Sequence, residues 1–157
     1  MKRTLLTIGL AATLALAPEV RAEGFADGLR SYDAGDYAAA VAVWSDLARR
    51  GDAEAEAALA GLYLQGLGVA ESAAQAAAWY RRAAKRGLMA AQMNLGDMYA
   101  AGRGVKRDLV EAYLWLGLAA AQGSTWSAGR RDEIAKVMSA TDIAEAEALA
   151  GAFKAKP

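Results

Sequence analysis

Cysteine and histidine are both absent from this chain of 157 residues. Without cysteine the chain has no disulfide and no thiolate nucleophile, and without histidine it has no imidazole to act as a general acid or base. The usual zinc sites are excluded as well, because they are built mainly from these two residue types. Most ready-made catalytic sites are therefore missing, and we expect a protein that is not an enzyme and binds neither a metal nor a cofactor.

The chain also has no excess of positive or negative charge. Lys and Arg together number 18, Asp and Glu together number 18, and the formal net charge is zero. A nucleic-acid-binding domain is expected to carry a basic face, so we exclude nucleic acid as a partner. Hydrophobic residues make up 55% of the chain, and alanine contributes much of that fraction, which favours one domain of closely spaced helices.

The first 22 residues have the features of a secretory signal peptide. Two basic residues come early, an apolar run of 13 residues follows over 5–17, and Val20 and Ala22 stand at −3 and −1 of a cleavage site. Cleavage after Ala22 predicts a slightly acidic mature chain that begins at Glu23 and is periplasmic or secreted. The alternative is an uncleaved anchor, although the run is shorter than the ~20 apolar residues that span a membrane.

The sequence repeats itself every 36 residues. The matched positions of two successive units are Leu59, Tyr63, Gly66, Gly68, Val69, Ala76, Trp79, Ala83, Ala84 and Gly87 on Leu95, Tyr99, Gly102, Gly104, Val105, Ala112, Trp115, Ala119, Ala120 and Gly123. A fixed period of this size predicts stacked units that bury their apolar faces against one another, an all-α solenoid of helix pairs. We place the units at about 24–51, 52–87 and 88–123, in a single domain that covers 23–157.

The ends of the predicted helices recur with the same period. We expect the second helix of each unit to be capped at its start by Asp36, Ser72 and Asp108. Gln75 and Glu111 stand three residues after the latter two caps, which is the pattern of a capping box. The same helices should end at glycines with left-handed backbone, Gly51, Gly87 and Gly123.

A glycine-rich loop joins the two helices in the second and third units, over 66–69 and 102–105. Such loops can hold phosphate, but here no Lys-Ser or Lys-Thr follows and no strand precedes. We expect the glycines to supply positive φ for a tight turn, and the valine after them to pack between the helices.

The tail, 124–157, breaks the period and is predicted to form two helices that cap the solenoid. The first is marked by Trp126, Arg130, Ile134, Val137 and Met138, and the second begins at Ser139 with the apolar stripe Ile143, Ala146, Leu149 and Phe153. Arg130 and Arg131 should lie on the solvated side. Trp79 and Trp115 occupy equivalent repeat positions, so we expect both in the core.

At these residues the sequence resembles the Sel1-like repeat family, whose members are relatives of tetratricopeptide repeats. The pattern Ala-x-x-x-Leu-Ala-Gly-Leu-Tyr-x-x-Gly-x-Gly-Val, followed by Ala-x-x-Trp-Tyr and a closing Ala-Ala-x-x-Gly, runs over 55–87, and its counterpart runs over 91–123. The resemblance implies a right-handed α/α superhelix that acts as an adaptor for proteins or peptides. Cysteine-rich secreted relatives are connected with β-lactams, an activity we do not transfer to a chain without cysteine.

In related repeats the first helix of each pair lines a groove, and this implies where a partner would bind. The expected groove residues are Glu54, Ala57, Gly61 and Gln65 in the second unit, and Ala90, Met93, Asp97 and Ala101 in the third. Small side chains edged by polar ones fit an extended segment or a helix, and Met93 is an adaptable apolar contact. The alternative is that small residues here only allow helices to approach closely.

Two other functions stay open at this stage. A hydrolase of envelope material would use carboxylates such as Glu54, Glu56 and Asp97, but these must face each other across a cleft, and the sequence shows no such pairing. A self-associating structural protein, for example a homodimer, would use the solenoid ends or its outer face. The leading hypothesis is a non-enzymatic adaptor of the cell envelope whose partner is a protein or peptide.

Overall fold

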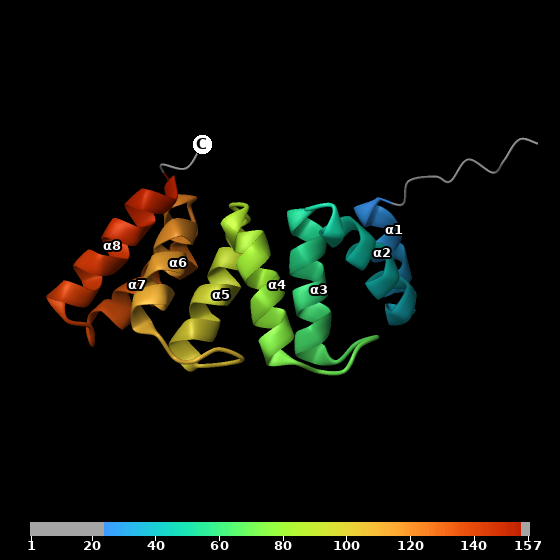
Figure 1. Ribbon diagram of the computed structural model, residues 1–157, viewed down its shortest axis with the longest axis horizontal. Coiled ribbons are helices and arrows are strands. Elements are labelled where there is room, and N and C mark those ends of the chain that lie inside the picture. The colour runs from blue at the N-terminus through green and yellow to red at the C-terminus, as the bar shows by residue number, and fades with distance from the viewer. Residues whose placement is uncertain (1–23, 155–157) are drawn as a thin grey trace, which may run out of the picture.

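The computed structural model describes residues 24–154, which form α-helices joined by short turns (Figure 1). The helices of this part are α1 (Phe25–Asp33), α2 (Tyr37–Arg49), α3 (Ala53–Gln65), α4 (Ala73–Lys85), α5 (Met89–Ala101), α6 (Leu109–Ala121), α7 (Thr125–Ala135) and α8 (Ala140–Lys154). The prediction of an all-α solenoid is confirmed. The predicted signal peptide and its cleavage site lie outside the described residues.

Each helix packs against the next along the chain, so the helices succeed one another along the long axis of Figure 1. The helix α8 departs from this order, because it packs mainly against α6 and not against α7. None of the helices in the described part is long and apolar enough to cross a membrane.

The core is built from small residues that let the helices approach closely. Alanines that are fully buried recur in both complete units, and Leu59 and Leu95 occupy equivalent buried positions in α3 and α5. Gly96 has no room for a side chain, since a Cβ there would lie 2.7 Å from Cγ of Leu116. The alanine-rich composition is thus a requirement of the spacing between helices.

The two repeat tryptophans lie in this core to different degrees. Trp115 is buried and donates a hydrogen bond from Nε1 to a carboxylate oxygen of Glu111 at 2.8 Å. Trp79 is partly exposed, packs between two clusters of the core, and has the Arg82 guanidinium over its ring at 4.6 Å. The prediction of core positions is therefore confirmed for Trp115 and holds in part for Trp79.

The predicted caps begin the second helices. The N–H groups of Ala39, Gln75 and Glu111 donate to the side chains of Asp36, Ser72 and Asp108 at 3.0, 3.2 and 3.1 Å. In a capping box the side chain three residues after the cap would accept a hydrogen bond from the N–H group of the cap residue, but here this N–H group has another acceptor. The cap N–H groups of Ser72 and Asp108 donate to the carbonyl oxygens of Tyr63 and Tyr99, at 2.8 and 3.1 Å, because the glycine loop brings each cap back beside the preceding helix.

The same helices end as predicted, at glycines with φ of +91°, +91° and +103° for Gly51, Gly87 and Gly123. Each ending carries two backbone hydrogen bonds. After α2, for example, the N–H of Asp52 donates to the carbonyl of Leu47 and the N–H of Gly51 to that of Ala48. This is the Schellman motif, which satisfies carbonyls that the helix leaves without partners.

The glycine loops fix how one unit sits on the previous one. All four loop glycines have φ between +66° and +69°. Gly68 and Gly104 also lie against backbone: a Cβ on Gly68 would be 2.6 Å from the carbonyl of Tyr37, and one on Gly104 would be 2.2 Å from the carbonyl oxygen of Ala73. Since Tyr37 and Ala73 are one period apart, each loop rests on the start of the second helix of the preceding unit.

Gly104→Ala should therefore destabilise the protein more than Gly87→Ala does. Both changes place alanine at positive φ, at a cost of about 1–2 kcal/mol, but a Cβ on Gly87 meets nothing within 4 Å. The clash with Ala73 should add about 1–3 kcal/mol to the Gly104 variant. Urea unfolding measures both values, and equal losses of stability would show that the loop does not rest on α4.

A buried polar position also repeats. The carboxylate of Glu56 is fully buried, with Nε of Arg82 3.0 Å from Oε1 and Nε of Arg86 3.1 Å from Oε2. Among the described residues Oε1 accepts no hydrogen bond, so Arg82 contributes through charge. One period later the buried Gln92 accepts a hydrogen bond from Gln122 at 2.8 Å and donates to a backbone carbonyl. An ionic pair in one unit thus corresponds to a neutral amide pair in the next.

Glu56→Ala should cost about 1–3 kcal/mol of unfolding free energy, because it removes the buried acceptor of a charge-assisted hydrogen bond, whereas the two arginines are nearly half exposed and can be solvated. Glu54→Ala, two residues away on the exposed side of α3, should change it by no more than about 0.5 kcal/mol. Thermal and urea denaturation compare the two variants. A Glu56 variant as stable as the Glu54 variant would contradict the structural role of this ion pair.

The tail forms two helices as predicted, but some of its residues lie elsewhere than expected. The first helix ends at Ala135, so Val137 falls in the following turn, where it is 71% exposed. Ser139 accepts a hydrogen bond from the N–H of Asp142 at 3.1 Å and begins α8. Leu149 is exposed because α8 buries only the face against α6, where Phe153 meets the Trp115 ring edge-on at 5.4 Å.

Candidate binding groove

The predicted groove residues lie on the outward faces of α3 and α5. The spacing of three or four residues places each set on one side of its helix. Every one of the eight is exposed or partly exposed, whereas Leu59 and Leu95, on the opposite sides of the same helices, are buried. The two faces are therefore open to a partner. Hollows form where a neighbouring helix stands beside one of these faces.

One hollow, which we call the N-terminal hollow, lies between α1 and α3 and encloses about 250 Å³. Its lining is Phe25, Leu29, Tyr32, Trp44, Ala58, Gly61, Leu62 and Gln65. Leu29 is exposed here, as one of the few large apolar side chains of the described residues that are not buried. Gly61 lies inside α3, and a Cβ built on it would meet nothing within 4 Å, so packing does not require glycine there.

A second hollow, the C-terminal hollow, lies between α5 and α7 and encloses about 340 Å³. It is lined by Met93, Asn94, Asp97 and Trp126. Trp126 leaves 51% of its surface exposed, while the other large side chain, Met93, is partly buried. An exposed tryptophan next to a methionine gives this hollow an apolar surface whose contact with water is unfavourable.

An ion pair bridges the helices at this hollow. Nε of Arg130 lies 3.1 Å from Oδ1 of Asp97, and both side chains remain close to half exposed. The expectation that Arg130 lies on the solvated side thus holds, but the residue also ties α7 to α5. Such an exposed pair contributes at most about 1 kcal/mol to stability and can exchange its partner for a charge on a ligand.

The structure places half of the predicted residues in the two hollows, two in each. Gly61 and Gln65 line the N-terminal hollow, and Met93 and Asp97 line the C-terminal one. The other four lie on the same helix faces outside these two hollows: Glu54, Ala57, Ala90 and Ala101. Sequence reasoning missed the contributions of α1 and α7, above all Trp126, because both helices lie outside the two units whose period was strongest.

The carboxylates considered for hydrolysis do not meet. Glu56 is buried between two arginines on one side of α3, Glu54 is exposed, and Asp97 pairs with Arg130. These three acids therefore do not form the facing pair that glycoside hydrolysis uses. Within residues 24–154 there is also no group of three or more acidic side chains that could hold a metal ion.

Comparison with known proteins gives the same architecture. Two of the similar solved structures are the c5321 protein, a protective antigen of uropathogenic Escherichia coli that displays an SLR fold, and a Sel1 repeat protein from Oxalobacter formigenes. The first has 32% identity and a TM-score of 0.76 over 82% of this chain and 28% of that one. The second has 31% identity and a TM-score of 0.65 over 69% and 44%. This chain thus spans less than half of either relative.

The sequence pattern of the Sel1 repeat matches residues 53–88 and 90–124. A search of curated proteins found no match. The two matched segments hold α3 with α4 and α5 with α6, and each contains one of the glycine loops that seat a unit on its predecessor. Through residues 53–124 the chain belongs to the Sel1 repeat family.

Proposed function

We propose that the chain is a non-enzymatic adaptor of the cell envelope that binds a protein or peptide along its first helices. Sel1 repeats in general mediate contacts between proteins, which supports the class of function. The observation that carries the proposal for this chain is the exposed Trp126 beside Met93 in the C-terminal hollow. Tryptophan in a hollow is among the residue types that most often dominate binding energy.

The chemistry of the two hollows indicates the kind of segment that would bind. Each hollow is of a size to take one or two apolar side chains, and the surface near them carries Ala57, Gly61 and Ala90, which leave room for a backbone. Asp97 and Arg130 at the C-terminal hollow can each pair with a charge on the segment. A helix or extended peptide with spaced apolar residues meets these conditions.

The test is capture of partners from envelope extract, with Trp126→Ala and the double variant Met93→Ala/Asp97→Ala compared with the unchanged protein. Both variants should lose the partner while the fold is kept, because Trp126 is half exposed, Met93 lies outside the buried core, and the Asp97 ion pair is weak. Val137→Ala is the matched control, since it removes an exposed apolar side chain outside the hollows. Capture that survives both hollow variants would contradict the proposal, and a dimer in light scattering without any partner would favour self-association.

Gly61→Ala gives a test that separates binding from stability. The change should raise the unfolding free energy by up to about 1 kcal/mol, because glycine inside a helix is less favourable than alanine, while the added methyl group narrows the N-terminal hollow. Partner capture should fall as the melting temperature rises. Gly129→Ala on α7, where a Cβ also meets nothing within 4 Å, is the control. It measures how much alanine in place of glycine raises the unfolding free energy at a helix position away from this hollow.

Export is the second part of the proposal and rests on residues 1–22. We expect the protein recovered from the periplasmic fraction of an expressing bacterium to begin at Glu23. Intact mass and N-terminal sequencing measure this directly. A full-length protein in the membrane fraction would favour the uncleaved anchor instead.

A further inference from the structure

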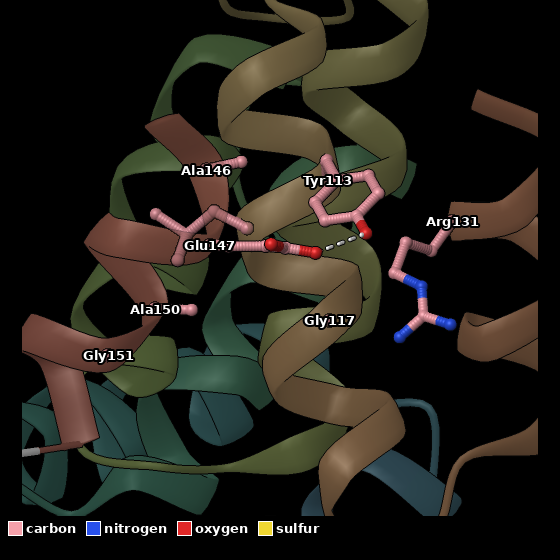
Figure 2. A pocket seen from close by; sticks show the side chains of 8 residues that line it. Tyr113, Gly117, Arg131, Ala146, Glu147, Ala150 and Gly151 are labelled. Atoms are coloured by element: carbon pink, nitrogen blue, oxygen red, sulfur yellow. Dashed lines mark hydrogen bonds between the residues drawn. The ribbon is translucent and has the colours of Figure 1, made fainter. Parts of the chain in front are cut away.

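A third hollow lies at the C-terminal end of the solenoid, away from the first-helix faces of α3 and α5. It exists because α8 packs on α6 and not on α7, so that α6 forms its floor and the other two helices form its walls (Figure 2). It encloses about 280 Å³ and is lined by Tyr113, Leu114, Gly117, Arg131, Ala146, Glu147, Ala150 and Gly151. We call it the cap cavity.

Three polar side chains from three different helices converge on the cap cavity, as Figure 2 shows. The hydroxyl of Tyr113 donates a long hydrogen bond of 3.4 Å to Oε1 of Glu147. The guanidinium of Arg131 lies 5.8 Å from the centre of the Tyr113 ring. The cavity thus has a cation on the α7 wall, a carboxylate on the α8 wall and a phenol on the floor between them.

Both charged groups keep capacity for a ligand. Asp132 accepts hydrogen bonds from Nε and Nη2 of Arg131, at 3.0 and 2.7 Å, and this leaves the hydrogens of Nη1. Glu147 has no ion-pair partner within the part of the chain that the structure describes. Arg131 stands one period after the buried Leu95, so a charge replaces the core leucine of the repeat at the cavity wall.

The two glycines that line the cap cavity also indicate a ligand site. Gly117 and Gly151 lie inside helices, where glycine costs about 1 kcal/mol relative to alanine. Neither has positive φ, and a Cβ would meet only Cδ of Arg131 at 3.8 Å in the first case and nothing within 4 Å in the second. Neither backbone conformation nor packing requires these glycines, and both keep the cavity open.

We propose that the cap cavity binds a free amino acid with an aliphatic side chain, such as leucine. Arg131 would bind the α-carboxylate through Nη1, and Glu147 would accept hydrogen bonds from the ammonium group. The side chain would lie against the small residues of α8. The volume is near the lower limit for small-molecule sites, which fits a ligand of this size.

The protonation of Tyr113 agrees with this arrangement. Burial raises the pKa of its phenol, Arg131 lowers that pKa, and Glu147 raises it again, with a net rise. At neutral pH the phenol therefore keeps its proton and holds the carboxylate of Glu147 in place as a hydrogen-bond donor.

The experiment is an NMR titration of the whole protein with leucine, beside leucine amide, which lacks the carboxylate, and N-acetyl-leucine, which lacks the ammonium group. We expect saturable shifts of the amide signals around the cavity with leucine, and affinities at least about tenfold weaker for both analogues. Arg131→Gln and Glu147→Gln should each weaken leucine binding by a similar factor. Lys136→Gln, which changes an exposed cation at the C-terminal end of α7 outside the hollows, is the matched control and should bind leucine as the unchanged protein does.

Gly117→Ala supplies a variant that does not depend on charge. It should melt at a higher temperature and bind leucine more weakly, whereas Gly129→Ala should gain stability without a change in binding. Absence of saturable shifts with leucine up to about 10 mM would overturn the proposal. Equal binding of N-acetyl-leucine and leucine would also overturn it, because recognition would then involve a carboxylate alone.

Discussion

The fold depends on one close approach: the glycine loop of each complete unit lies against the first turn of the second helix in the unit before it. Gly68 meets the backbone of Tyr37, and Gly104 meets that of Ala73, at distances that exclude any side chain. Because the contact is between backbones, it fixes the spacing of the units independently of side-chain packing. The alanine-rich helices then pack at the distance that this contact sets.

The two ends of the solenoid differ from its middle. The first unit has no glycine loop, its helix α1 is short, and Leu29 is exposed next to α3. At the other end Arg131 occupies the place of a core leucine, and α8 moves onto α6. Departures from the repeat therefore produce the three hollows that we describe, and the regular part between them supplies a rigid frame.

Much of the fold could be predicted from the sequence, because the signals that begin and end the helices are local and recur in successive units. The caps Asp36, Ser72 and Asp108 and the helix-ending glycines act on neighbouring backbone, and a period of 36 repeats each signal. The partners of buried polar groups could not be predicted in this way. The ion pairs of Glu56 with Arg82 and Arg86 span about thirty residues and depend on how two helix pairs stack.

The candidate binding surface was predicted only where the repeat continues. Met93 and Asp97 follow from the helix period of α5, but the exposed Trp126 beside them comes from α7, which lies outside the two matched repeats. The same holds for Val137, which sequence reasoning placed inside a helix and which lies in a turn. The places of both residues depend on the tertiary packing of the tail, which no local sequence pattern predicts.

The central claim is that the first helices bind a partner at the C-terminal hollow, and photo-crosslinking in the expressing cell tests it most directly. A photoreactive amino acid would replace Asn94, which lines this hollow, and in a second variant Val137, which is also exposed but lies outside it. The account predicts a discrete crosslinked product from position 94 and none from position 137. Equal products from both positions, or none from position 94, would contradict it.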